Sequence, residues 1–189
     1  IVGTSMGGHI AAAAVAAETQ ETANNKVRYD GSVPMCGVLG DTELYNYFGA
    51  SQIAAQQLAG MPVTTWPVPN WAEQGPKVRS ALFTTFPTAT TPQGDQYKEI
   101  VKQLTGGERP MFNEGFAGSM NATVWGTFGR DGTINGILNR EGYDTTGIVY
   151  QFDNDPALTA TEQSFNQTAY RLRADPEANR LRRDGLRWF

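Results

Sequence analysis

The chain has one cysteine and one histidine among its 189 residues, and these scarcities exclude several classes of protein. A single thiol, Cys36, cannot form a disulfide within the chain. Structural and catalytic zinc sites need clustered cysteine, histidine and carboxylate ligands, so the sequence predicts no metal site. None of its patterns implies any other cofactor, and we expect none.

Long apolar runs and an excess of positive charge are also missing. No apolar run approaches the roughly 20 residues that cross a bilayer as a helix, so we expect no membrane span. The net charge is −4, from 15 basic and 19 acidic residues, which gives no electrostatic reason to bind nucleic acid. Lysine is scarce while amide and hydroxyl side chains abound, which favours an exported protein, secreted or periplasmic.

The most informative pattern is GTSMGGH at residues 3–9. Its first five residues fit G-x-S-x-G, the nucleophile elbow of serine hydrolases of the α/β-hydrolase type. Ser5 must then stand on a strained turn between a strand and a helix, and large side chains two residues away would collide there, which predicts glycine at Gly3 and Gly7. The amide of Met6 begins the helix and can donate a hydrogen bond to a developing oxyanion.

The surrounding sequence gives this turn the expected context. Residues 1–2 can end a buried strand, and the alanine-rich residues 10–18 favour a helix. A second buried strand is expected at 32–36, parallel to the first, so that Cys36, Gly37 and Asp41 lie near the same edge. We expect Cys36 to be a small core residue rather than a nucleophile.

The rest of the chain predicts mostly helices. Helices are expected at 41–59, 78–86 and 95–104, with an ordered loop rich in proline and tryptophan between the first two. Residues 146–155 look like a strand, and a capping box from Thr159 to Glu162 begins a helix that runs to about residue 173.

These elements predict an α/β protein, namely a partial α/β-hydrolase fold: a parallel sheet with flanking helices that carries a mostly helical cap. Residues 1–40 would be the core segment with the elbow, and residues 41–145 the cap or lid. Residues 146–189 would return toward the core and stop before the expected catalytic acid and histidine. Caps of this kind line a substrate pocket and exclude water.

A general base and an acid are harder to find. In this fold the chain order is serine, then aspartate or glutamate, then histidine. His9 lies on the elbow's own helix, so we expect it to pack near the site rather than act as the base. Asp41, Asp153 and Asp155 are candidates for the acid, and the residues alone leave the choice open.

Several segments together resemble a group of large secreted or periplasmic α/β-hydrolases of bacteria and fungi, described as esterase-like. They are residues 3–9, 34–40 (PMCGVLG), 43–48 (ELYNYF), 150–156 (YQFDNDP) and 184–188 (DGLRW). The resemblance implies that Asp155 is structural, that the acid and histidine follow residue 189, and that the second oxyanion donor precedes residue 1. Of the family's catalytic groups, the resemblance assigns only the nucleophile, Ser5, and one oxyanion donor, the amide of Met6, to this sequence.

We therefore expect a serine hydrolase that acts on small-molecule or polymeric carboxylic esters through an acyl-enzyme on Ser5. The chain would be an internal fragment, its partner the rest of its own polypeptide, and inactive alone because no catalytic histidine is present. The alternative is a non-catalytic fragment or interaction module with an α/β-hydrolase ancestry.

Overall fold

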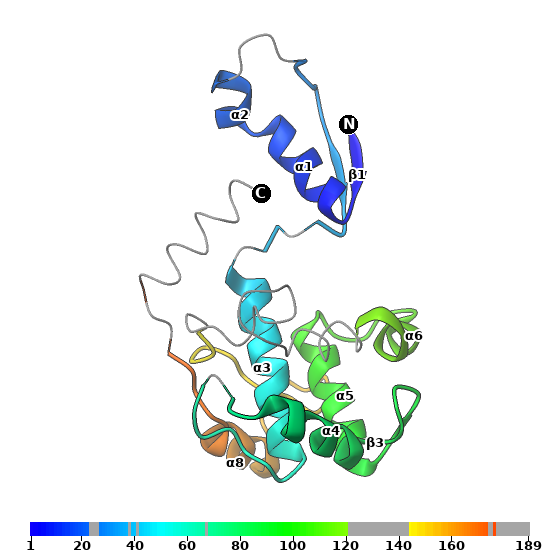
Figure 1. Ribbon diagram of the computed structural model, residues 1–189, viewed down its shortest axis with the longest axis vertical. Helices are drawn as coiled ribbons and strands as arrows, with labels where there is room; N and C mark the ends of the chain where they lie inside the picture. The colour runs from blue at the N-terminus through cyan, green and yellow to red at the C-terminus, as the bar shows by residue number, and fades with distance from the viewer. Residues whose placement is uncertain are drawn as a thin grey trace. The chain divides into compact units, whose positions relative to one another are not determined.

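The computed structural model describes residues 1–22, 27–37, 39–40, 42–66, 68–120, 144–173 and 176. These residues combine helices with two small sheets, one parallel and one antiparallel (Figure 1). The chain divides into two compact units, the first holding Ile1–Leu44 and the second beginning at Tyr45.

The first unit contains a strand, a turn and a helix in the predicted order. Strand β1 (Val2–Thr4) leads into helix α1 (Met6–Val15), which is followed by helix α2 (Ala17–Thr22) and strand β2 (Val33–Met35). The two strands are parallel, with Val2 opposite Val33 and Thr4 opposite Met35. Helix α1 packs against both strands (Figure 1). The predicted second parallel strand is thus confirmed.

The prediction that these strands are buried is wrong for the described part of the chain. Val2 is 65% exposed and Val33 is 55% exposed. Side chains alternate between the two faces of a sheet, and Gly3 faces α1, so Val2 and Val33 stand on the opposite face. One helix covers one face of this two-stranded sheet, and the described residues of the unit put nothing on the other.

The second unit is mainly helical in its described residues. Its helices are α3 (Thr42–Leu58), which starts just before the boundary, α4 (Trp71–Leu82), α5 (Pro92–Leu104), α6 (Phe112–Gly115), the π-helical turn η1 (Phe116–Met120) and α8 (Ala160–Thr168). A short antiparallel pair, β3 (Phe83–Thr85) and β4 (Ala89–Thr90), lies between α4 and α5. Residues 121–143 of the predicted cap lie outside the described residues.

Helix α3 runs through the middle of this unit, with α4, α5 and α8 around it (Figure 1). Ala50, Ile53, Ala54 and Ala55 are fully buried, and so are polar residues on the same two turns. Alanines at three of these positions take up little volume, and the larger Ile53 is buried as completely beside them. Most of the aromatic core gathers around it. That core includes Trp66, Trp71, Tyr97, Phe112, Phe116, Tyr150 and Phe165.

The helix predicted at 78–86 is shifted. Helix α4 begins at Trp71 and ends at Leu82, with Pro76 inside it. The indole of Trp71 packs against Gly75, where an added Cβ would come within 2.9 Å of Trp71 Cε2. Pro76 lies early in the helix and removes one intrahelical hydrogen bond, which the buried indole offsets.

The helix predicted at 95–104 begins three residues earlier, at Pro92. The Thr91 hydroxyl accepts a hydrogen bond from the amide of Gly94 at 3.1 Å, and Pro92 fits the first helical position. The same hydroxyl donates to the Ala81 carbonyl at 2.7 Å, which joins the start of α5 to the end of α4.

The strand predicted at 146–155 is wrong. Its backbone pairs with side chains of α8 instead of with another strand. The Asn166 carboxamide accepts from the Tyr150 amide at 2.9 Å and donates to the Tyr150 carbonyl at 2.7 Å. The Glu162 carboxylate accepts from the Phe152 amide at 2.6 Å. These hydrogen bonds pair the backbone amides and carbonyl of an extended segment, as a neighbouring strand would.

The capping box is confirmed. The Thr159 hydroxyl accepts from the Glu162 amide, and the Glu162 carboxylate accepts from the Thr159 amide at 2.7 Å. The helix ends at Thr168, earlier than predicted. Arg171 then turns back, and its guanidinium donates to the carbonyls of Ile148 at 2.6 Å and Asn166 at 2.8 Å.

Residues 144–173 belong with the helical unit. The Tyr150 hydroxyl donates to the Ala50 carbonyl of α3 at 3.4 Å, and Gln57 Nε2 donates to Thr168 Oγ1 at 2.8 Å. The described part of the predicted return segment therefore completes the core around α3.

Glu162 gives the second unit an acid-sensitive contact. Its side chain is 1% exposed, and hydrogen bonds, first of all that from the Phe152 amide, hold the pKa of its carboxyl below the usual value of 4.5. A lowered folded-state pKa stabilises the fold above the unfolded pKa, and this contribution is lost as pH falls through the folded value. Glu162→Gln should lower the free energy of unfolding at pH 7 by about 1–3 kcal/mol.

Denaturant titrations at pH 7 and below pH 4 test this prediction. Glu162→Gln should show a weaker loss of stability on acidification than the unmodified protein. Glu114→Gln is the control, because Glu114 is exposed on α6 and should leave the pH dependence unchanged. Equal acid dependence in all three proteins would contradict the assignment.

Candidate functional site

The turn between β1 and α1 holds Ser5 in an unusual backbone conformation. Its φ is 56° and its ψ is −121°, a combination that residues other than glycine avoid. The Ser5 amide donates to the Met35 carbonyl at 2.9 Å, and the Ser5 carbonyl accepts from the Gly8 amide at 2.9 Å. The backbone is thus fixed on both sides, while the residue is exposed and its hydroxyl does not cap α1.

Met6 is the first residue of α1. Its amide has no carbonyl partner within the helix, and the helix start carries partial positive charge. An anion that forms on a group bound to Ser5 would lie beside this amide. The Met6 side chain is 73% exposed, so the residue contributes through its backbone.

Gly3 allows the helix to begin directly after the strand. A Cβ at Gly3 would lie 1.9 Å from the Gly7 carbonyl oxygen, so no side chain fits there. The predicted steric need at Gly7 is wrong among the described residues, because a Cβ at Gly7 would meet no atom there within 4 Å outside its own helix. The carbonyl of Gly7, rather than its α-carbon, makes the close contact.

Two further glycines bring α1 against the strands, and sequence reasoning did not assign them this role. A Cβ at Gly8 would lie 2.5 Å from the Met35 carbonyl oxygen, and one at Gly37 would lie 2.8 Å from the His9 amide nitrogen. Their positions could have indicated this role, since Gly8 lies in the first turn of the helix and Gly37 follows the second parallel strand.

Cys36 is exposed, so the prediction that it is a core residue is wrong. It follows Met35, which pairs with Thr4, and therefore stands next to Ser5 at the carboxyl edge of the parallel pair. Its φ of 52° is also positive. Neighbouring strands are about 4.8 Å apart, so the backbones of these two residues lie close together.

The candidate bases and acids do not pair with Ser5 in the described residues. His9 lies half-buried on α1, and its imidazole forms no hydrogen bond with the Ser5 hydroxyl. Asp153 and Asp155 lie in the second unit and hold a turn: Asp153 accepts from the Asp155 amide, and Asp155 from the Ala157 amide, both at 2.9 Å. Asp41 lies outside the described residues.

No group of three or more histidine, cysteine, aspartate or glutamate side chains in the described ranges could hold a metal ion. None of the helices there has the length and apolar character to cross a membrane. No protein-family model, curated protein or solved structure matches the chain.

Two glycine variants test the packing of this turn. Gly3→Ala places a methyl group against the Gly7 carbonyl and should lower the free energy of unfolding of the first unit by about 1–3 kcal/mol or more. Gly7→Ala enters open space within a helix and should be neutral or stabilise by up to about 1 kcal/mol. Circular dichroism during denaturant unfolding measures both, and equal effects would contradict the packing.

Proposed function

We propose that Ser5 is the nucleophile of a serine hydrolase that acts on carboxylic esters, and that the first unit is part of an α/β-hydrolase core. One observation carries the proposal: an exposed serine is held in a glycine-like conformation at the junction of a parallel strand and a helix. Strain of this kind costs about 1–3 kcal/mol and is concentrated at functional sites.

The proposed chemistry follows from the groups on this turn. The Ser5 hydroxyl attacks the ester carbonyl carbon as its proton passes to a general base, and the carbonyl oxygen becomes an oxyanion. The Met6 amide donates a hydrogen bond to that oxyanion. The intermediate collapses as the alcohol leaves with a proton, and water then releases the acid from the acyl-enzyme.

This mechanism also needs a general base and an acid. The chain's only histidine, His9, is on α1 itself. Its backbone amide donates to the Ser5 carbonyl at 3.2 Å, but its imidazole forms no hydrogen bond with the Ser5 hydroxyl in the described residues. The hydrolase resemblance implies that other segments of the polypeptide supply both groups. We also propose that the chain belongs to the esterase-like hydrolases that its sequence resembles. The protein would then be secreted or periplasmic, and the second unit would act as the cap.

A non-catalytic interaction module is the second candidate, and the apolar surface of the first unit favours it. Large hydrophobic side chains are exposed on the sheet face that α1 does not cover, namely Val2, Val33 and Met35, with Ile1 just before the first strand. Clustered exposed apolar side chains are typical of interaction surfaces. A non-catalytic module requires an unreactive Ser5, so reactivity at Ser5 decides between the two candidates.

Labelling with a fluorophosphonate probe tests the nucleophile in the protein expressed from its full gene. The probe should add once, and Ser5→Ala should abolish the adduct and lower ester turnover by roughly 10⁴-fold or more. Ser32→Ala, in the same unit, is the control and should label normally. An unlabelled protein, or a label that survives in Ser5→Ala, would favour the interaction module.

Cys36 tests the geometry of the same edge. A bulky maleimide on the Cys36 thiol should slow fluorophosphonate labelling of Ser5, because the two residues end neighbouring parallel strands. A small methylthio group on the thiol should slow it much less. The control is Cys36→Ser treated with the same maleimide, which should keep the unmodified rate, and equal rates in every case would place the thiol away from Ser5.

A further inference from the structure

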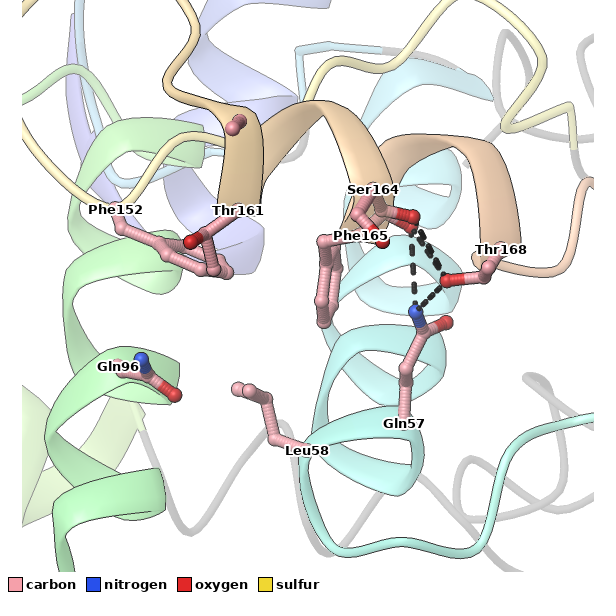
Figure 2. A pocket seen from close by; sticks show the side chains of 9 residues that line it. Gln57, Leu58, Gln96, Phe152, Thr161, Ser164, Phe165 and Thr168 are labelled. Atoms are coloured by element: carbon pink, nitrogen blue, oxygen red, sulfur yellow. Dashed lines mark hydrogen bonds between the residues drawn. The ribbon is translucent and has the colours of Figure 1, made fainter.

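A second candidate site lies wholly within the second unit. A depression of about 510 Å³ opens between α3, α5, α8 and the turn at Phe152. Figure 2 shows the rings of Phe152 and Phe165 beside it, with Leu58 and Gln96 on the facing helices. The volume lies within the range of small-molecule sites.

The aromatic wall of this depression is held in place by its surroundings. The rings of Phe152 and Phe165 meet edge to face, with centroids 5.3 Å apart and planes at 75°. Phe165 meets Tyr150 in the same way at 5.4 Å, and the Phe152 amide is bound by Glu162. A ligand would therefore find this wall formed in advance, which lowers the entropy lost on binding.

The polar groups of the depression fall into two sets. Gln57 and Thr168 bind each other, with Gln57 Nε2 donating to Thr168 Oγ1 at 2.8 Å, so they close the end of the site (Figure 2). The carboxamide of Gln96 and the hydroxyls of Thr161 and Ser164 form no hydrogen bond within the described part of the chain. These neutral donors and acceptors are available to a ligand.

The lining limits the chemistry of that ligand. No lining residue is charged, so a charged ligand would lose hydration without gaining an ionic partner. Gln96, Thr161 and Ser164 are exposed, and a wholly apolar ligand would displace water from them without replacing its hydrogen bonds. A ligand with a flat apolar face and a neutral polar edge satisfies both walls.

We propose that this depression binds a neutral pyranose sugar unit. The C–H face of the ring packs on the more exposed ring of Phe152, beside the edge of the Phe152–Phe165 pair, and its hydroxyls bind the Gln96 carboxamide and the hydroxyls of Thr161 and Ser164. All of its lining residues belong to the second unit, and the proposal does not depend on the proposed hydrolase activity of Ser5.

Ligand-observed saturation-transfer NMR with methyl β-D-glucopyranoside tests the proposal. The sugar should receive saturation from the protein at millimolar concentration, and glucuronate should receive much less. Gln96→Leu should weaken sugar binding about 3- to 10-fold, the loss expected for one neutral hydrogen bond. Phe152→Leu, which keeps an apolar group but removes the ring, should weaken binding as well.

Two control variants test whether sugar binding is confined to this depression. Gln93→Leu changes an exposed glutamine on the same helix outside the depression and should leave binding unchanged. Ser5→Ala should also bind normally, so loss of the hydrolase proposal does not affect this one. The proposal is overturned if no saturation transfer to the sugar occurs, or if Gln96→Leu and Phe152→Leu, folded by circular dichroism, bind like the unmodified protein.

Discussion

The first unit depends on one close approach, that of the Gly7 carbonyl to the α-carbon of Gly3. With any side chain at Gly3 the helix could not begin one residue after the strand, because its Cβ would lie 1.9 Å from that oxygen. The close start fixes the direction of α1, brings Gly8 against β2 and leaves Ser5 as the single residue that turns the chain. The conformation of Ser5 is therefore a consequence of packing on both sides of it.

The second unit is built on a different constraint. Helix α3 is enclosed by its neighbours, and the extended backbone of residues 150–152 is bound by side chains of α8 instead of by a strand. Asn166 and Glu162 serve the helix and the segment beside it at once, since Glu162 also closes the capping box. The same contacts hold Phe152 against Phe165, so the wall of the candidate sugar site depends on them.

Short sequence patterns correctly predicted the features that depend mainly on residues close together in the chain. The strand–turn–helix at Ser5 and the capping box at Thr159 each follow from a few neighbouring residues, and the parallel second strand was expected from the hydrolase pattern. One failure is local: α4 begins early, with Trp71 packed on Gly75 one turn away, although Pro76 inside it suggested a loop. Another involves a distant partner, since residues 146–155 have strand-like composition but α8 supplies their hydrogen bonds. Exposure of Cys36 likewise follows from how many strands flank it, which its own sequence does not encode.

The backbone at Ser5 is distinct even among strained residues. Asn70 and Met111 also precede helices with positive φ, but their ψ values of 37° and 10° place them in or near the left-handed helical region. Ser5, with a ψ of −121°, lies in the mirror image of the β region, which glycine enters at no steric cost. A glycine would fit this turn better than serine. The Ser5 hydroxyl also makes no hydrogen bond that caps α1, so it does not stabilise the turn in that way. A serine that destabilises its own turn, and leaves its hydroxyl exposed at a helix start, supports the proposal that this hydroxyl acts on a ligand, because backbone strain is concentrated at functional sites.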